Sequence, residues 1–398
     1  MAEQQTRPTV RILPRRHQRV KAGHPWVYSN EIEMTPAVKA LPPGTVVDVA
    51  NAGGEPLGSA MVNPHSLVAL RVIDAAPGAR LDRGLIAPRL AAARDLRDRL
   101  VGGACYRLVH AEADRLPGLI VDRFDDVVVV QANTAGMQAA EAEVLAALRD
   151  VLAPRSIVLR NDSPARAAEG LDLHTRVDGA PPDLPLAFVE NGVRFLADPS
   201  EGQKTGWFHD QRDNRRAVAE LARGARVLDV FAYTGGFGVT AACAGAAEVV
   251  MIDRSEPALA LAERAAALND VADRCRFVRA AAFAELETLG GGGARFDVVV
   301  VDPPAFVKSR RDLAAGSRGY TKLTRLAAPL VSPGGFLLVA SCSHNVAPDL
   351  FADLVRKGLE AAGRNGRILR SAGAAPDHPV HPFLPESAYL KVQLLQLD

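Results

Sequence analysis

Reactive residue types follow three apolar runs of this chain. Cys342 comes after the run 336–340, Asp302 follows the valines at 298–301, and a glycine-rich turn begins just after Asp229. Each apolar run is typical of a buried strand. The carboxyl ends of parallel strands meet at one edge of an open sheet, where such sheets place their chemistry. We therefore expect a thiol, an acid and a glycine turn to lie close together.

The thiol of Cys342 is a candidate nucleophile. Carbon 5 of cytosine is poorly nucleophilic, but addition of a thiolate to carbon 6 converts the ring into an enamine that can attack a methyl donor. Lys308 or local dipoles would help the thiol to lose its proton. An isolated cysteine is more often a small buried hydrophobic residue. The neighbouring acid turn favours catalysis.

The turn Asp302-Pro303-Pro304-Ala305-Phe306 would present a polar group and backbone carbonyls to a planar base, with Phe306 packed against that base. We expect the Asp302 carboxylate to meet the base near N3 and to favour its protonated form. Similar turns occur in enzymes that methylate exocyclic amines. An amine methyltransferase in which Cys342 is a bystander is therefore the alternative.

Residues 229–238 predict the cofactor site. A strand leads into glycines at 235, 236 and 238 and then into a helix, so the backbone can approach a ligand closely. A second strand ends in Asp253, whose carboxylate can accept hydrogen bonds from both ribose hydroxyls. The G-x-G-x-x-G spacing is absent, so S-adenosylmethionine, which has no pyrophosphate, fits better than a dinucleotide. The competing interpretation is a tight turn, with Asp253 as the N-cap of a helix at 255–268.

Two basic segments predict contacts to the backbone of a nucleic acid, because lysine and arginine neutralise phosphates. The candidate RNA-binding residues are Arg15, Arg16, Arg19 and Lys21 near the N-terminus, and Lys308, Arg310, Arg311 and Arg318 after the acid turn. The plainer interpretation is solvated surface. The polar segment 204–216 would cover the cofactor with its aromatic and amide side chains, or begin the helix that leads to the first core strand.

The composition is that of a globular protein with two or three domains: 398 residues, a formal net charge of +1 and 48% hydrophobic residues. No apolar run reaches the length of about 18 residues that a membrane span needs, and we expect no secretory signal. The four cysteines lie too far apart for a disulfide framework or a paired metal site. We expect a cytoplasmic protein without a metal.

The chain divides into three expected domains: a small β module at 1–75, a central α+β domain at 76–188 and an α/β domain at 189–398. In the last domain, strands near 226–231, 248–252, 276–279, 297–301 and 335–340 alternate with helical patterns. Such alternation predicts a mostly parallel sheet with crossover helices. Residues 389–395 alternate in polarity, which predicts an edge strand.

Taken together, these motifs resemble the bacterial ribosomal RNA large-subunit methyltransferase I family of cytosine-C5 enzymes. The resemblance runs almost end to end and is carried by residues 24–29, 114–122, 204–212, 229–236, the Asp302 turn and 341–343. It implies a class I (Rossmann-like) S-adenosylmethionine-dependent methyltransferase domain, an N-terminal PUA-like RNA-binding domain, a central domain and a homodimer. It also implies 5-methylcytosine in 23S ribosomal RNA as the product. Cys342 would be the single catalytic cysteine, since Ala305 stands where a second one would sit.

The motifs and the resemblance together give a set of candidate cofactor-binding residues: Phe208, Gln211, Arg212, Asp229, Phe231, Tyr233, Thr234, Gly235, Gly236, Asp253, Arg254, Ala281, Ala282, Asp302 and Pro303. One departure matters. The family usually has an acid after the third strand, where it meets the adenine amino group, but this chain has alanines at 280–282. Contact there must come from the backbone, or affinity is reduced. A non-catalytic RNA-binding or ribosome-assembly factor is therefore a third hypothesis, and cofactor binding would test it.

Overall fold

The computed structural model describes residues 7–200, 202, 203 and 205–398. The chain forms two compact units, and each is described by itself. The first comprises Met1–Asp183, Pro199–Gly206 and Pro376–Ser387, and the second comprises Leu184–Asp198, Trp207–Ala375 and Ala388–Asp398. The chain therefore passes between the units several times. The expected limits of the three domains remain a prediction.

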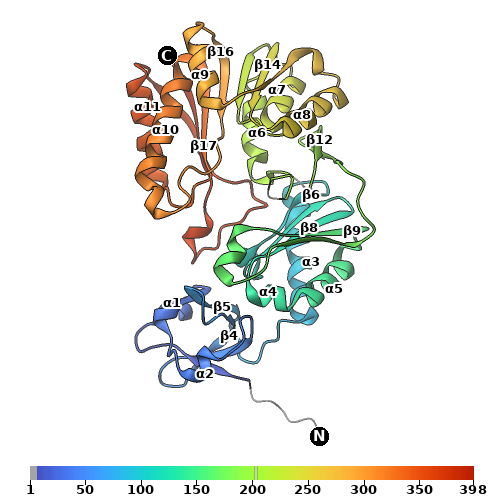
Figure 1. Ribbon diagram of the computed structural model, residues 1–398, viewed down its shortest axis with the longest axis vertical. Coiled ribbons are helices and arrows are strands. Elements are labelled where there is room, and N and C mark those ends of the chain that lie inside the picture. The colour runs from blue at the N-terminus through green and yellow to red at the C-terminus, as the bar shows by residue number, and fades with distance from the viewer. Residues whose placement is uncertain (1–6, 201, 204) are drawn as a thin grey trace. The chain divides into compact units, whose positions relative to one another are not determined.

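The first unit begins with a small β module (Figure 1). Its five strands have the order β1-β3-β4-β5-β2. They are β1 (Thr9–Arg11), β2 (Trp26–Tyr28), β3 (Val46–Ala50), β4 (Pro56–Val62) and β5 (Val68–Asp74), with short helices α1 (Gln18–Lys21) and α2 (Pro36–Lys39). The strands predicted at 46–49, 57–62 and 67–72 are confirmed. Alternate residues of β3 point into a core with Val10 and Leu70.

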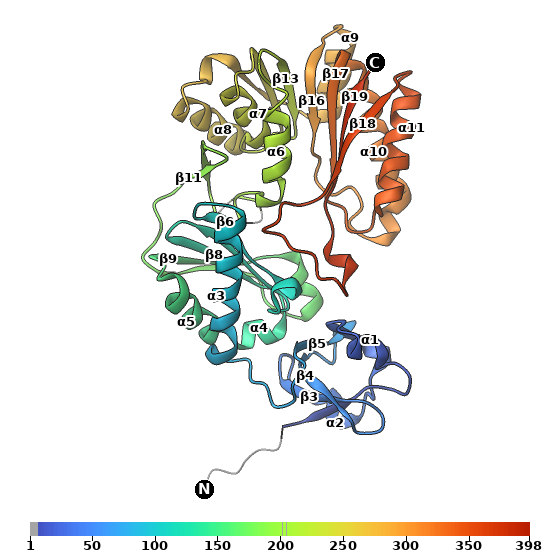
Figure 2. The same cartoon turned by 180° about the vertical axis from the view of Figure 1, so that it is seen from behind.

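A second sheet in the same unit has the order β10-β9-β8-β7-β6. Its elements are α3 (Arg83–Leu100), β6 (Cys105–His110), β7 (Leu119–Phe124), β8 (Val127–Ala132), α4 (Ala135–Ala139), α5 (Glu141–Leu152), β9 (Ser156–Asn161) and β10 (His174–Gly179). Helices α3 and α5 pack together and cover this sheet (Figure 2). The predicted helix at 137–152 is two helices that meet at Ala140.

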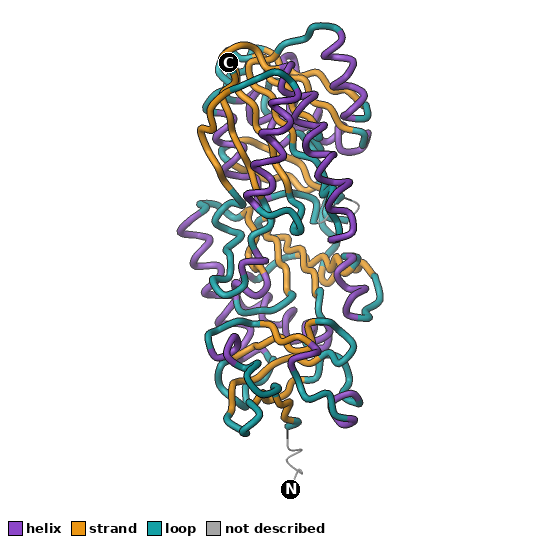
Figure 3. Tube along the Cα trace, turned by 90° about the vertical axis from the view of Figure 1, so that its left-hand side faces the viewer, coloured by secondary structure: helices purple, strands orange, loops and turns teal. Residues whose placement is uncertain are grey.

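The second unit alternates strands and helices along the chain, as predicted. Figure 3 shows helices and strands by colour. A hairpin of β11 (Leu186–Glu190) and β12 (Val193–Ala197) precedes the main sheet. The strands of that sheet are β13 (Arg226–Val230), β14 (Glu248–Asp253), β15 (Cys275–Arg279), β16 (Phe296–Val301), β17 (Val331–Ser341), β18 (Gly366–Ala372) and β19 (Lys391–Leu397). The helices are α6 (Arg212–Ala219), α7 (Gly236–Cys243), α8 (Glu256–Leu268), α9 (Ala282–Gly291), α10 (Leu313–Ala327) and α11 (Pro348–Ala361).

The main sheet has the order β15-β14-β13-β16-β17-β19-β18. The first five strands are parallel, and β19 and β18 are antiparallel additions. Helices lie on both faces (Figures 1 and 2). The sheet is covered on both sides, so β16 can be the continuous valine run 298–301, every residue of which is buried.

The prediction of an edge strand at the C-terminus is wrong. Strand β19 lies between β17 and β18, and β18 is the edge. The residues of β18 are exposed except at its last position, whereas those of β19 are buried except for Gln396. Even the polar side chains of Lys391 and Gln393 are buried. The alternating pattern of β19 therefore belongs to an internal strand in which two polar side chains are buried.

Candidate active site

Four strand ends carry the predicted chemistry. Asp229 lies in β13, Asp253 ends β14, Asp302 follows β16 and Cys342 follows β17. These strands are neighbours in the order β14-β13-β16-β17. The charges of Asp302 and Asp253 both act on Asp229. The predicted meeting of these groups at one sheet edge is confirmed.

The loop after β13 has an unusual backbone. Phe231, Tyr233 and Gly235 have φ angles of 67°, 50° and 80°. The left-handed region is unfavourable for bulky residues, and each such residue costs on the order of 1–3 kcal/mol. The surrounding structure must therefore hold this loop. The amides of Phe231 and Ala232 both donate to the Ile252 carbonyl, at 2.9 and 3.0 Å.

Asp253 is part of that support. Its Oδ2 accepts from the Tyr233 amide at 2.9 Å and its Oδ1 accepts from the Ser255 amide at 2.8 Å. Ser255, not Asp253, is the N-cap of α8, because its side chain accepts from the Ala258 amide. The N-cap interpretation of Asp253 is therefore wrong. A carboxylate has further acceptor sites, so Asp253 can still bind hydroxyl groups.

Asp229 is fully enclosed. Burial, with the nearby charges of Asp302 and Asp253, raises its pKa to about 7, against the lowering effect of the Gly238 amide, which donates to Oδ2 at 2.8 Å. The Oδ1 atom of Asp229 and the hydroxyl of Thr234 are buried, and neither has a hydrogen-bond partner among the described residues. An open acceptor and an open hydroxyl beside a glycine turn fit the amino and carboxylate groups of S-adenosylmethionine.

Gly236 is also required by packing, because Arg215 leaves no room for a side chain at this position. A Cβ atom there would lie 2.5 Å from Arg215 Nε. The glycine pattern that predicted close approach to a ligand therefore partly reports close approach to an arginine.

A chain of amides links the acid turn to the segment before β13. Gln211 Nε2 donates to Asp302 Oδ2 at 2.9 Å, and Asn214 Nδ2 donates to Gln211 Oε1 at 2.7 Å. Phe208 packs edge-on against Tyr233 with ring centroids 5.4 Å apart. The segment also begins α6, as one of the two interpretations expected. Lys204 lies outside the described residues.

Glu190, which the sequence did not single out, organises this segment. Its carboxylate is buried and accepts from Arg215 Nη1 at 2.5 Å and from Trp207 Nε1 at 3.0 Å. Arg212 Nη1 lies 3.5 Å from the same carboxylate. Arg212 thus faces an internal acid. The sequence offered one clue to Glu190. It is an acid at the end of a strand, and the next two residues, Asn191-Gly192, form a hairpin turn.

The Asp302 turn is seated on α10. A Cβ atom on Gly316 would lie 2.6 Å from the Phe306 carbonyl, so this helix approaches the turn closely. The Phe306 ring packs on Tyr320 and Phe283, with centroid distances of 4.8 and 6.0 Å. Phe306 is partly buried and packs against the core of the domain, and its expected contact with a base remains a prediction.

Cys342 is partly exposed, and its neighbours are anchored. Its Sγ lies 3.9 Å from the Pro303 carbonyl, to which the thiol donates. On either side, Ser341 Oγ donates to the Tyr320 hydroxyl at 2.9 Å, and Ser343 Oγ lies 2.8 Å from the same hydroxyl. The buried tyrosine therefore holds both flanking serines and leaves the thiol beside the acid turn.

A lysine that the sequence did not single out lies at the strand end that bears the thiol. Lys308 is exposed. Lys391, on β19, is buried and interacts electrostatically with Cys342. This residue was missed because it lies far from Cys342 in the sequence and only the pairing of β17 with β19 brings it there.

The remaining predicted cofactor residues lie around the same edge. Ala281 is the N-cap of α9, without a side-chain cap, and Ala282 is its first residue. Arg254 is exposed, next to Asp253. These positions offer backbone groups and an exposed cation.

The predicted RNA-binding residues are all exposed. In the β module, Arg19 pairs with Glu31 at 3.2 Å and Lys21 with Glu55 at 3.8 Å. After the acid turn, Lys308 precedes the short helical turn Arg310–Asp312, and Arg318 lies on α10. The two basic groups lie in different units.

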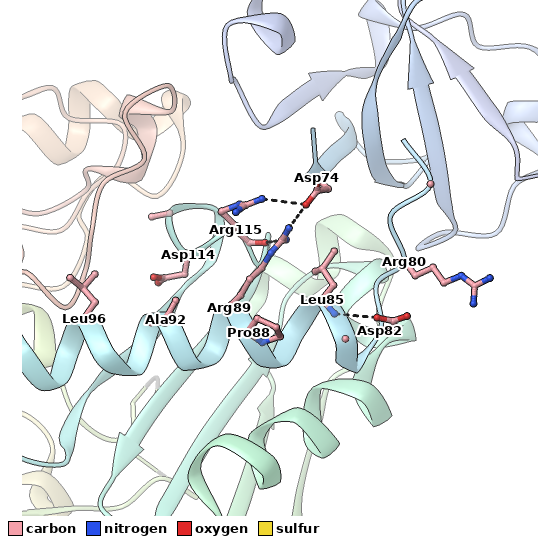
Figure 4. A pocket seen from close by; sticks show the side chains of 14 residues that line it. Asp74, Arg80, Asp82, Leu85, Pro88, Arg89, Ala92, Leu96, Asp114 and Arg115 are labelled. Atoms are coloured by element: carbon pink, nitrogen blue, oxygen red, sulfur yellow. Dashed lines mark hydrogen bonds and ion pairs between the residues drawn. The ribbon is translucent and has the colours of Figure 1, made fainter. Parts of the chain in front are cut away.

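A cavity of about 810 Å³ lies in the first unit, lined by residues of β5, α3 and the turn before β7 (Figure 4). Arg89 forms part of its wall and donates to Asp74 Oδ2 at 2.7 Å and to the Arg115 carbonyl at 2.6 Å. Arg115 also reaches Asp74, at 3.3 Å. The arginines here brace the unit internally, and none of the predicted site residues lines this cavity.

The residues of the segment 114–122 make contacts within the first unit. Asp114 accepts from Arg97 at 2.6 and 2.8 Å, and Asp122 accepts from Arg107 and Thr205. Gly118 has a φ of 79°, and a Cβ there would lie 2.2 Å from Thr134. This segment is therefore structural.

Comparison with known proteins decides the family. The S-adenosylmethionine-dependent methyltransferase model matches residues 158–385, and the PUA-like domain model matches 10–75. Proteins named ribosomal RNA large subunit methyltransferase I are 36% identical to the chain in Escherichia coli K12 and 38% in Aeromonas hydrophila. The matches cover 92% and 96% of this chain and 94% and 98% of those proteins. The chain belongs to this family.

Solved structures agree on the fold. A candidate S-adenosylmethionine-dependent methyltransferase from Streptococcus mutans aligns with a TM-score of 0.82 at 21% identity, covering 98% of this chain and all of that chain. A candidate methyltransferase complexed with SAH aligns with a TM-score of 0.84 at 20% identity and the same coverage. The predicted methyltransferase fold with an N-terminal PUA-like domain is confirmed.

Membership of this family makes the chain an S-adenosylmethionine-dependent methyltransferase. The third hypothesis, a non-catalytic factor, is thereby set aside. Within the part of the chain that the structure describes, no cluster of histidine, cysteine and acidic residues could hold a metal ion. No described helix has the length and apolarity that a membrane crossing requires.

Proposed function

We propose that this enzyme methylates carbon 5 of a cytosine in large-subunit ribosomal RNA through a covalent adduct between Cys342 and carbon 6. The name of its relatives supports the RNA class. The observation that supports the covalent mechanism is the position of Cys342. Its Sγ lies 3.9 Å from the carbonyl oxygen of Pro303, the residue after Asp302. This contact supports the proposal because it brings a thiol close to the residue after Asp302, at the edge where open α/β sheets bind ligands.

The proposed steps balance without a further reagent. The Cys342 thiolate forms a bond to carbon 6, and the electron pair of the 5,6 double bond becomes available at carbon 5. Carbon 5 then takes the methyl group that S-adenosylmethionine supplies from its sulfonium. Water then removes the proton from carbon 5. The electron pair of that carbon–hydrogen bond re-forms the 5,6 double bond as the sulfur–carbon bond breaks, and Cys342 leaves as the thiolate. Splitting one difficult substitution into such steps is the advantage of nucleophilic catalysis.

Asp302 is proposed to hold the base during addition. Its Oδ2 accepts from Gln211, which orients the carboxylate before substrate arrives. A proton taken up from water at N3 of cytosine and hydrogen-bonded to the Asp302 carboxylate makes the ring more electrophilic as the thiolate adds. This interaction strengthens toward the transition state, so it accelerates turnover more than binding.

The cofactor is proposed to lie across the ends of β13 and β14. Asp253 would accept from the ribose hydroxyls, while Asp229 Oδ1 and Thr234 Oγ1 would meet the methionyl end. Phe208 and Tyr233, in edge-on contact, would border it. Ala281 and Ala282 leave only backbone groups for the adenine.

The exposed basic residues are proposed to hold RNA phosphates. They are Arg15, Arg16, Arg19 and Lys21 of the β module, and Lys308, Arg310, Arg311 and Arg318 beside the acid turn. The target base must leave its stack to reach Cys342, so cytosines in single strands or loops should react best. The homodimer and the cytoplasmic location remain predictions.

The test is a map of 5-methylcytosine in large-subunit ribosomal RNA from cells with and without the protein. We expect one or more cytosines to lose the mark in its absence and regain it when purified enzyme and cofactor are added. Methylation of an exocyclic amine, with no change at carbon 5, would favour the alternative in which Cys342 is a bystander.

A further inference from the structure

Lys391 is an unusual residue for its position. It lies on β19, directly opposite Ser341 in the β17–β19 pair, and the residue is 6% exposed. Its Nζ donates to the Ser343 carbonyl at 2.6 Å and to the Tyr389 carbonyl at 2.7 Å. The first of these carbonyls belongs to the residue that follows Cys342. The ammonium is thus held at the strand end that bears the thiol.

A buried lysine normally faces a carboxylate. Among the described residues, no carboxylate lies within ion-pair distance of Lys391. Two backbone carbonyls use two of its three donors, which leaves one donor of the ammonium. Burial lowers the pKa of Lys391 to about 8, and the charge of Cys342 opposes that lowering. A negative charge on Cys342 would therefore stabilise the ammonium.

The other titratable groups around this strand end are engaged elsewhere. The Tyr320 hydroxyl is bonded to Ser341 and Ser343, and Asp302 accepts from Gln211. The Tyr389 hydroxyl donates to Asp210, and the His344 ring stacks on that tyrosine at 5.2 Å. Within the part of the chain that the structure describes, none of them forms an ion pair with Lys391, so a thiolate at Cys342 would be its counter-charge.

We propose that Lys391 is a positioning residue that keeps Cys342 ionised, its ammonium being fixed by the Ser343 and Tyr389 carbonyls. The thiol proton passes to solvent water, and the ammonium keeps its own protons. This inference rests on the proposed function in one respect, the use of the Cys342 thiolate as nucleophile. The alternative is a purely structural lysine that ties the end of β17 to residue 389.

The test measures alkylation of Cys342 by iodoacetamide in the folded enzyme, followed by peptide mass spectrometry between pH 6 and pH 10. Only the thiolate reacts, so the rate reports its fraction. We expect Lys391→Met to slow the reaction about tenfold at pH 7, the size of a one-unit change in ionisation. The difference should vanish above about pH 9, where Lys391 itself is neutral. Lys391→Arg should keep most of the wild-type rate, and Lys357→Met, on the surface of α11, should change nothing.

A wild-type rate for Lys391→Met at every pH would overturn the proposal. An internal comparison covers the case in which that variant does not fold. In the unmodified enzyme at pH 7, Cys342 should react faster than Cys243. The residue Cys243 is the more exposed of the two, but partial desolvation of its thiol raises its pKa. An equal or slower reaction of Cys342 would also overturn it. Alkylation needs neither RNA nor cofactor, so this outcome is independent of whether Cys342→Ala still methylates RNA.

Discussion

The two halves of the sheet edge are built by different means. At the ends of β13 and β14, carboxylates accept backbone amides and hold a loop with left-handed residues: Asp253 accepts from Tyr233, and Asp229 accepts from Gly238. At the ends of β16 and β17, side chains from distant elements hold the segment that carries Cys342: Tyr320 binds the flanking serines, and Lys391 binds the next carbonyl. In the first half, hydrogen bonds to the backbone fix the shape of a loop. In the second half, side chains set the position and the electrostatic environment of Cys342. Mutations should therefore separate binding from chemistry.

The largest effect among the carboxylates is expected at Asp302. Asp302→Ala should lower kcat by about 10²–10³, the usual loss when a group that stabilises the transition state is removed. Cofactor affinity should change little. Single-turnover kinetics with saturating RNA and calorimetry would measure the two. Asp302→Asn keeps an acceptor for Gln211 and removes the charge, so full activity of that variant would contradict the proposed role.

Asp253→Ala should act in the opposite way. Loss of a charged acceptor costs about 1.5–3 kcal/mol for one hydrogen bond, so the dissociation constant for S-adenosylmethionine should rise at least about tenfold. The loop at Tyr233 also loses its support. Calorimetry checks this, with Ser255→Ala as the control, because it removes the N-cap of α8 alone. Unchanged affinity of Asp253→Ala would mean that the carboxylate serves the loop only.

The affinity for the cofactor should depend on pH through Asp229, which lies in the proposed cofactor-binding half of the edge. Burial raises the pKa of Asp229 to about 7, so the residue gains its charge between pH 6 and pH 8. A cationic cofactor prefers the ionised form, and affinity should rise with pH by up to about tenfold if binding lowers this pKa by one unit. Asp229→Asn should abolish the slope. Because the folded pKa lies above the ordinary value of 3.8, the stability that this group contributes is lost as the pH rises through 7. Thermal unfolding of the cofactor-free enzyme would show that loss.

The smallest effect is expected from the exposed arginines of the β module. Replacing Arg15 and Arg16 by glutamine should weaken RNA binding a few-fold and leave turnover at saturating RNA unchanged. The slope of log affinity against log salt should fall by about 0.7 for each lost phosphate contact. A matched pair of changes at Arg356 and Lys357 of α11 is the control. Equal slopes for both pairs would remove this module as the proposed RNA anchor.

Local patterns in the sequence predicted much of this domain. Apolar runs ending in Asp229, Asp253, Asp302 and Cys342 were enough to predict a parallel sheet with these groups at one edge, because strand polarity and βαβ connection constrain where strand ends lie. The partners of those groups were not predictable in the same way. Tyr320, Lys391 and Glu190 reach the site through long-range packing, and no spacing in the sequence announces them. The wrong prediction for β19 has the same cause. The alternating pattern that predicted an edge strand includes Lys391, which long-range packing buries.

The central claim is covalent catalysis by Cys342. Ribosomal RNA transcribed with 5-fluorocytidine, incubated with the enzyme and S-adenosylmethionine, tests it most directly, because fluorine at carbon 5 cannot leave as the proton does. We predict a protein–RNA adduct that survives denaturing electrophoresis and maps to the peptide containing Cys342. Cys342→Ala should form no adduct and lose methylation, whereas Cys243→Ala should behave as wild type. Methylation of normal RNA by Cys342→Ala, or the absence of an adduct from an enzyme that methylates normal RNA, would contradict the account.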